Sequence, residues 1–201
     1  MLNMGGETMT QLTLAPAITL SNWQFEHLCR QNPDSNVELS SQGVLIMSPP
    51  VGFEGGNREF NLAVQFGRWV EQDGTGVGFS SQTLFELPNG AKYMPDLAWV
   101  QRDRLGMLTP EQRRGFAAIA PDFVVELRSP SDALAPLQAK MLDYLDGGVR
   151  LAWLIDPQGR RVEVYQLGVD RQVLENPSTV SGDPVLPGFT LDLKPLFNSV
   201  V

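Results

Sequence analysis

The sequence predicts a single α/β domain built on a mixed β-sheet. Helical and strand-like segments are mixed along the chain, and no internal repeat, linker or low-complexity tract interrupts them. Several strand-like segments are apolar along their whole length, which is typical of strands buried on both faces. The 201 residues, 42% of them hydrophobic and 19% charged, suffice for one domain with a substantial core.

The first expected element is a helix capped by Ser21. Gln24, three residues further on, completes a capping-box pattern before the segment NWQFEHLCRQ. Residues 36–50 then predict two short strands around a polar turn, ended by a pair of prolines. Residues 1–20 lack the basic start and apolar centre of a signal peptide, so we expect a flexible N-terminal arm followed by one domain at residues 21–201.

A long amphipathic helix is expected next, ending at the sequence DGTG. Its apolar residues recur with the spacing of one helical face, at Leu62, Phe66, Trp69 and Val70. Two strands joined by a PNG turn follow, then a polar connection, a third strand and a helix that ends at a Gly-Gly pair. These four elements are expected at residues 77–87, 93–101, 121–129 and 130–148. Three further strands and a short tail complete the domain.

Two carboxylates within apolar strands are the first functional signal. Asp96 follows Pro95 at the mouth of one strand, and Glu126 lies in the middle of the next, which also begins with Pro-Asp. A buried carboxylate is costly unless it is paired, and two such groups repel each other. If the strands are neighbours, a divalent cation removes that repulsion by binding both acids, with the backbone carbonyl of Leu127 as a further ligand.

The single histidine and the single cysteine exclude several chemistries. Zinc sites built from several histidines are impossible, and a Ser-His-Asp triad would need His27, which we expect to be a surface or packing residue. Any metal site must therefore rest on carboxylates, which suit Mg²⁺ or Mn²⁺. Cys29 can form no internal disulfide and is expected to be a buried thiol, so the cytoplasm is the default location.

Charge and hydropathy limit the partners. The net charge of −8 argues against bulk attraction to nucleic acid, although it allows local basic patches. No apolar stretch approaches the roughly 20 residues of a membrane span, so we expect no membrane partner. Arginines between the two acidic strands either flank a DNA path or decorate a solvated loop. They are Arg102, Arg104, Arg113 and Arg114.

Lys140 and Glu54 are weaker candidates. Lys140 lies at the edge of the apolar stripe of the helix after the second acidic strand, one turn before Tyr144. Near a metal site its ammonium could orient an attacking water or stabilise negative charge, whereas most helix lysines are simply solvated. Glu54 begins the long helix, where glutamates are common partners of the helix dipole. In the segment SPSD, Ser131 or Asp132 is the expected N-cap of the lysine-bearing helix.

Taken together, these segments resemble the Uma2 family, also called DUF820, which is similar to restriction endonucleases of the PD-(D/E)XK fold. The resemblance runs in order from about residue 22 to residue 195. It rests on MSPP…FEGG, PDLAWV, PDFVVELRSPSD, the Lys140-x-x-x-Tyr144 pair, GGVRLAWLIDP and RRVEVYQLG. It implies a restriction endonuclease-like fold, with a mixed central β-sheet flanked by helices and additional antiparallel strands.

The resemblance also implies roles for individual residues. Asp96 matches the Pro-Asp acid and Glu126 matches the acid of the (D/E)XK strand, and both would bind Mg²⁺ or Mn²⁺. Lys140 matches the lysine that this family carries on the following helix. Glu54 matches an acid of the first core helix and is a further candidate ligand, although the next position, often histidine in relatives, is Gly55 here.

Arg128 occupies the usual position of the motif lysine, two residues after the second acid. Its planar guanidinium suits a phosphate of the substrate, which makes it a candidate substrate-binding residue. Alternatively, it pairs with an acid such as Asp132. The sequence does not decide between these two interpretations.

The implied reaction is the hydrolysis of DNA phosphodiesters by a metal-dependent endonuclease. A homodimer is expected, because two symmetric sites suit cleavage of both strands. One alternative is a catalytically inactive nuclease-fold protein that binds DNA or self-associates, which the acidic charge and the missing histidine favour. Another is a glycoside hydrolase that uses Asp96 and Glu126 as acid and base without a metal.

Overall fold

The computed structural model describes residues 9–198 and centres on a six-stranded sheet. In spatial order the strands are β11 (Val169–Glu175), β10 (Arg161–Gln166), β9 (Leu151–Asp156), β8 (Phe123–Leu127), β7 (Leu97–Gln101) and β4 (Gly76–Ser80). Only β8 and β9 are parallel, and α5 (Leu134–Asp146) connects them, because a parallel pair needs a crossover. The expected mixed central sheet is confirmed.

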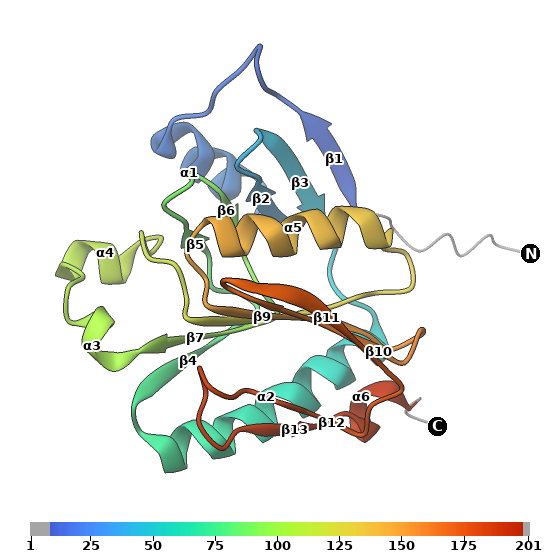
Figure 1. Cartoon of the computed structure of the whole chain (residues 1–201). Helices are drawn as coiled ribbons and strands as arrows, with labels where there is room; N and C mark the ends of the chain where they lie inside the picture. Colours follow the sequence, from blue (N-terminus) through green and yellow to red (C-terminus); the bar gives the residue numbers. More distant parts are fainter. Residues whose placement is uncertain (1–8, 199–201) are drawn as a thin grey trace, which may run out of the picture.

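Helices cover both faces of this sheet (Figure 1). One face carries α2 (Phe53–Asp73), α6 (Lys194–Phe197) and the strand pair β12 (Thr179–Ser181) and β13 (Thr190–Asp192), while α5 covers the other. Because side chains alternate along a strand, Phe123 and Val125 of β8 pack toward α2. Val124 and Glu126 therefore face α5.

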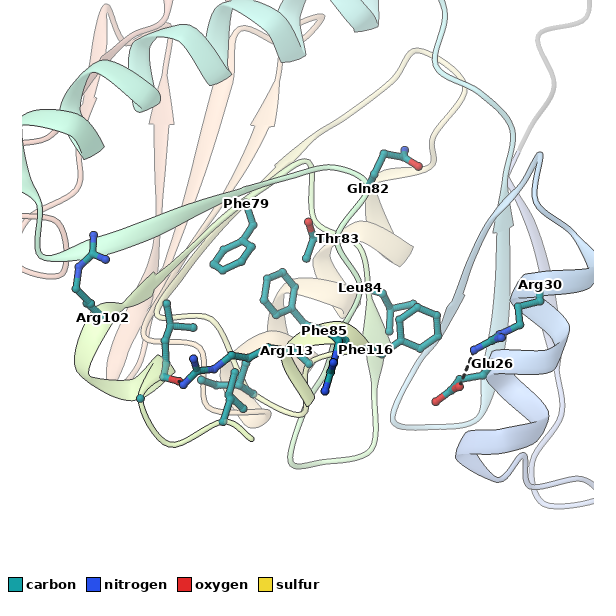
Figure 2. A pocket seen from close by; sticks show the side chains of 17 residues that line it. Glu26, Arg30, Phe79, Gln82, Thr83, Leu84, Phe85, Arg102, Arg113 and Phe116 are labelled. Carbon is teal, nitrogen blue, oxygen red and sulfur yellow. Dashed lines mark hydrogen bonds and ion pairs between the residues drawn. The ribbon is translucent and has the colours of Figure 1, made fainter. Parts of the chain in front are cut away.

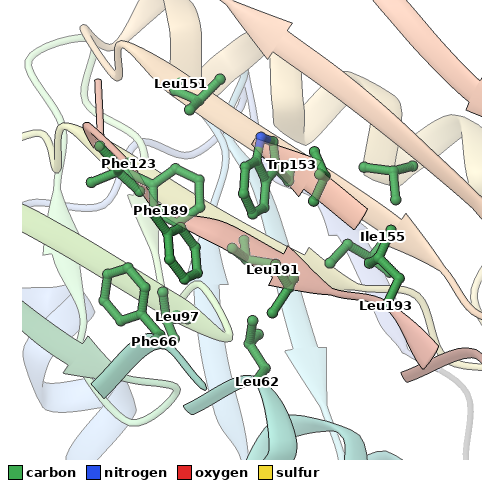
Figure 3. Close-up of a cluster of buried hydrophobic side chains, with 14 of the residues drawn as sticks. Leu62, Phe66, Leu97, Phe123, Leu151, Trp153, Ile155, Phe189, Leu191 and Leu193 are labelled. Carbon is green, nitrogen blue, oxygen red and sulfur yellow. The ribbon is translucent and has the colours of Figure 1, made fainter. Parts of the chain in front are cut away.

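The α2 face is filled by aliphatic side chains packed around a group of aromatic rings (Figure 3). The indole of Trp153 lies 4.8 Å from the ring of Phe123 and 5.9 Å from that of Phe189, measured between centroids. Phe66 of α2 contacts the same Phe189 ring edge-on at 5.2 Å. Trp153 is fully buried, so it serves as a packing residue.

A second, five-stranded sheet lies beyond α5 (Figure 1), and its strands pair antiparallel, as expected for the additional strands. Their assembly into one separate sheet was not predicted. Its strands, in spatial order, are β1 (Thr10–Thr13), β3 (Val44–Ser48), β2 (Asn36–Leu39), β6 (Lys92–Tyr93) and β5 (Phe85–Glu86). The strands expected at residues 77–87 and 93–101 are each divided between the two sheets. Pro95 contributes to the second break, because proline donates no hydrogen bond to a strand ladder.

The helix ends agree only in part with the sequence pattern. Helix α1 (Asn22–Gln31) has the predicted capping box between Ser21 and Gln24. The predicted cap of α5 is wrong: Ala133 occupies the N-cap position without a side-chain bond. Asp132 instead accepts a hydrogen bond from the backbone N–H of Ser129 at 3.0 Å, which closes the preceding turn.

The expected N-terminal arm and the expected polar connection both contain secondary structure. Residues 10–13 of the expected arm form β1, which pairs with β3, whereas residues 1–8 lie outside the described part. The connection after β7 contains α3 (Arg102–Leu105) and α4 (Pro110–Arg114). Within residues 9–198, every helix is too short or too polar to cross a membrane.

Substitutions at two glycines can test the packing between α2 and the central sheet. A Cβ atom at Gly76 of β4 would lie 2.2 Å from the Trp99 ring, whereas one at Gly67 of α2 would meet nothing within 4 Å. We expect Gly76→Ala to lower the free energy of unfolding by about 1–3 kcal/mol, because the rigid ring must move. Gly67→Ala should raise it by roughly 0.5–1 kcal/mol through helix propensity. Urea unfolding measures both, and equal effects of the two substitutions would contradict this packing.

Candidate functional site

The site is built around the edge where β7 begins and β8 ends. These strands are antiparallel neighbours with Leu97 opposite Val125, so the next pair outward brings Asp96 beside Glu126. One carboxylate oxygen of Asp96, Oδ2, accepts a hydrogen bond from the backbone N–H of Leu127 at 2.6 Å. The sheet thus places the two acids at one point, as the strand pattern predicts for adjacent strands.

Helix α5 adds two polar side chains to this point. Lys140 and Tyr144 are one turn apart and therefore share the face of α5 that lies over β8. Lys140 Nζ lies 2.8 Å from Glu126 Oε1, and the Tyr144 hydroxyl donates to the same oxygen at 2.8 Å. All three side chains are buried, which confirms that Lys140 is not a solvated helix lysine.

Glu38 of β2 completes the arrangement and was missed at the level of sequence. Lys140 Nζ donates to both of its carboxylate oxygens, at 2.9 and 3.1 Å. The backbone N–H of Met94 donates to Glu38 Oε1 at 2.6 Å. The signal was available, because Glu38 is flanked by Val37 and Leu39 in an apolar strand, the same pattern that singled out Glu126.

An open cavity of about 840 Å³ is lined by Asp96, Glu126, Lys140 and Glu38. Its walls include the loop after β3 and the segment Ser129–Asp132, so the acids are accessible from one side. Glu59 of α2 also lines this cavity and accepts a hydrogen bond from the Ser81 hydroxyl at 3.3 Å. It lies one turn before Leu62 of the apolar stripe, which explains its inward position.

Glu54, the acid expected from this helix, is not among the residues that line the cavity. Its carboxylate accepts from Arg58 Nη2 at 2.9 Å, and about half of its side chain, 48%, is exposed. An ion pair four residues apart on a helix surface is a common structural arrangement. The structure therefore brings Glu59, and not Glu54, to the cavity that contains Asp96 and Glu126.

Burial and repulsion disfavour the charged forms of the acids. Burial, followed by the charges of Glu126 and Glu59, raises the pKa of Asp96 well above its usual range. Burial also raises the pKa of Glu126; Lys140 opposes that shift and Glu38 reinforces it. The cavity is thus short of positive charge, which a divalent cation would supply.

For Lys140, in contrast, the surroundings favour the charged form. Burial alone would lower its pKa, but the charges of Glu126 and Glu38 outweigh burial, so its pKa is raised above the ordinary value. The ammonium is therefore protonated at neutral pH. In this position Lys140 can act as a fixed cation and hydrogen-bond donor, and not as a general base.

The donor chemistry fits a hard divalent ion in an open site. Asp96, Glu126 and Leu127 all line the cavity and offer two carboxylates and one backbone carbonyl. Within residues 9–198, no three histidine, cysteine or acidic side chains are arranged to hold a metal on their own. Mg²⁺ commonly uses only one or two carboxylates and completes its shell with water and substrate phosphate, so this donor set is compatible with it.

Arg128 makes structural contacts. Its Nη1 lies 2.8 Å from Asp156 Oδ2 and its Nε donates to the backbone carbonyl of Asp132 at 3.0 Å. It is not among the residues that line the cavity. The structure thus pairs Arg128 with an acid, which is the second of the two interpretations. The acid is Asp156 and not Asp132.

The histidine and the cysteine lie outside the site. The exposed His27 ring stacks on Trp23 at 5.3 Å between centroids. Cys29 is half-buried, and not buried as expected, beside the apolar cluster around Phe25. Neither residue lines the cavity that contains the two acids.

Comparison with known proteins gives one family and one fold. Residues 23–194 match the family model Uma2, described as "Putative restriction endonuclease". A crystal structure described as "a putative nuclease belonging to DUF820", from Anabaena variabilis, matches with a TM-score of 0.67 at 22% identity, over 80% of this chain and 89% of that one. No curated protein matches. Because the family model spans most of the chain, this protein is a member of the Uma2 family.

Proposed function

We propose that this protein is a metal-dependent endonuclease that hydrolyses DNA phosphodiesters. The observation that carries the proposal is the convergence of Asp96, Glu126 and Lys140, from three separate segments, in one accessible cavity. A site built from two carboxylates and a buried ammonium suits a reaction in which negative charge develops on a phosphoryl group. The family description of a restriction endonuclease supports a nucleic acid substrate.

In this proposal Asp96, Glu126 and the carbonyl of Leu127 hold Mg²⁺ or Mn²⁺. When bound, the ion supplies charge stabilisation at a phosphoryl oxygen and a water of lowered pKa. Lys140 Nζ donates hydrogen bonds to the attacking water or to the developing negative charge. Glu38 is a positioning residue, because it holds the ammonium of Lys140 against the metal-binding acid Glu126.

The glycoside hydrolase alternative finds less support. An acid–base pair of carboxylates needs space between its members for the sugar and, in inverting enzymes, for a water. Here the Lys140 ammonium is bonded to Glu126 Oε1, and Leu127 N–H occupies one oxygen of Asp96. These contacts suit cation binding better than proton transfer to a sugar.

We also propose that the protein acts in the cytoplasm as a homodimer. Large apolar side chains are exposed at Val51 (52%), which lines the cavity that contains the two acids, and at Phe53 (84%) and Phe60 (67%), which share one face of α2. Exposed apolar groups next to one another commonly mark an interaction surface. We expect light scattering to give twice the chain mass for the wild type and the monomer mass for Phe53→Ser with Phe60→Ser. A monomeric wild type would contradict the dimer.

The metal site can be tested separately from catalysis. We expect Asp96→Asn and Glu126→Gln to weaken Mn²⁺ binding at least about tenfold in calorimetry and to abolish plasmid cleavage, as EDTA should. Without metal, Asp96→Asn should not lower the melting temperature, because it removes a carboxylate that burial and repulsion disfavour.

The matched control for these variants is Asp170→Asn, an exposed acid on β11. It should bind Mn²⁺ and cleave plasmid as the wild type does. If the wild type binds no Mn²⁺ and cleaves no DNA, the catalytically inactive DNA-binding or self-associating module becomes the better interpretation.

The role of Glu38 predicts a separation of metal binding from rate. Glu38→Gln should lower the cleavage rate about 10–100-fold, because Lys140 loses one of the two charges that hold it. Mn²⁺ affinity should change by less than a few-fold, because Glu38 is not a metal ligand in this proposal. Glu163→Gln is the control, since Glu163 is a buried acid bonded to Gln138 and Tyr165 outside the cavity. Equal rates for the two variants would rule out a positioning role for Glu38.

A further inference from the structure

A second cavity, of about 850 Å³, lies between α1, the segment that joins β4 to β5, and the α3–α4 connection (Figure 2). Its volume is within the range of about 300–1,000 Å³ that is typical of ligand sites. None of the acids or the lysine of the catalytic site lines it. It therefore needs an explanation of its own.

The floor of this cavity is aromatic. Phe79 and Phe85 meet edge to face with their ring centroids 5.4 Å apart, and Phe116 lies across from them (Figure 2). Phe79 and Phe116 are half-buried, so each presents part of its ring to the open space. Exposed aromatic rings in a pocket favour a flat aromatic group such as a nucleobase, which stacks through its π-face.

The rim of the cavity is basic. Four arginines and one glutamate line it, in a chain whose net charge is −8. The guanidinium of Arg102 donates to the backbone carbonyls of Gly74 and Gly76, and that of Arg113 donates to the carbonyl of Leu105. In the described part of the chain, neither arginine forms an ion pair with a carboxylate. No neighbouring acid therefore offsets their positive charge, which can attract an anionic ligand such as phosphate.

The cavity adjoins the catalytic one. Gln82 lines both, with Ser81 on the catalytic side and Thr83 on the aromatic side. Figure 2 shows Gln82 and Thr83 on the segment that leads to the two phenylalanines. A chain of nucleotides could thus pass from the acids to the phenylalanines over one short segment of the protein.

We propose that this cavity binds a nucleotide of the DNA strand next to the scissile phosphate, an inference that rests on the proposed nuclease function. The base lies against Phe79 and Phe116, and its phosphate lies against Arg102 and Arg113. A base that is stacked and paired inside a duplex cannot enter such a pocket. The substrate class is therefore single-stranded or locally unpaired DNA.

Fluorescence anisotropy with a short labelled single strand, without divalent ions so that cleavage cannot occur, tests the proposal. The variants are Arg102→Gln with Arg113→Gln, and Phe79→Leu. The charge-matched control is Arg68→Gln with Arg161→Gln, since Arg68 is exposed and Arg161 pairs with the exposed Glu175. Melting temperatures verify that each variant is folded.

We expect the wild type to bind the single strand at least about tenfold more tightly than the same sequence as a duplex. Each cavity variant should weaken single-strand binding about tenfold, and the control should not. The arginine variant should also reduce the salt dependence of binding, whereas Phe79→Leu should leave it unchanged, because only the arginines release counterions from phosphates.

Two outcomes would overturn the inference. One is cavity variants that bind the single strand as the control does. The other is competition by a free mononucleotide as effective as by the strand, which would assign the cavity to a small nucleotide ligand. Calorimetry with Mn²⁺ on the same proteins separates the two proposals. Normal Mn²⁺ binding with no strand binding contradicts only the cavity inference, and strand binding with no Mn²⁺ binding contradicts only the metal-dependent nuclease.

Discussion

The buried ion group formed by Lys140, Glu126 and Glu38 determines how the rest of the molecule is arranged. Burying a charge is costly unless partners surround it, and here one ammonium is bonded to carboxylates from two different sheets. Helix α5 must therefore lie between the central sheet and the five-stranded sheet, with the face that bears Lys140 and Tyr144 turned toward both. The cavity lies at the open edge of this three-part junction because Asp96 joins the two sheets there.

The two neighbouring cavities differ in the predominant sign of the charged side chains that line them. The cavity that contains Asp96 and Glu126 is acidic, and burial together with repulsion from neighbouring carboxylates raises the pKa of both acids, so it favours a cation. The neighbouring cavity has an arginine rim and an aromatic floor, so it favours an anion that carries a flat group. An overall charge of −8 hides this local contrast, which is why net charge alone is a poor guide to the partner.

Sequence reasoning located the central acids because they depend on local pattern and on one pairing. Asp96 and Glu126 needed only that their strands be neighbours in one sheet. Lys140 was singled out by the resemblance to the Uma2 family, because spacing along the helix does not separate it from a solvated lysine. Glu59 was missed because its inward position depends on how α2 packs on the sheet. Glu38 has the same apolar strand pattern as Glu126, but its approach to Lys140 depends on how the second sheet packs against α5. The division of two expected strands between sheets, and the absence of a side-chain cap on α5, likewise arise from tertiary contacts that override local preference.

The passage of the chain between the two sheets has a consequence for folding. The chain leaves the central sheet after β4, visits the small sheet in β5 and β6, and returns through Met94 and Asp96. The polar groups that line the cavity of Asp96 and Glu126 consequently come from segments distant in sequence, and loop closure must precede their contacts. The central sheet alone can bring Asp96 and Glu126 together, but the complete site, in which Glu38 holds Lys140, needs both sheets. Appearance of the complete site during refolding would therefore report the docking of both sheets, a later event than the formation of either one.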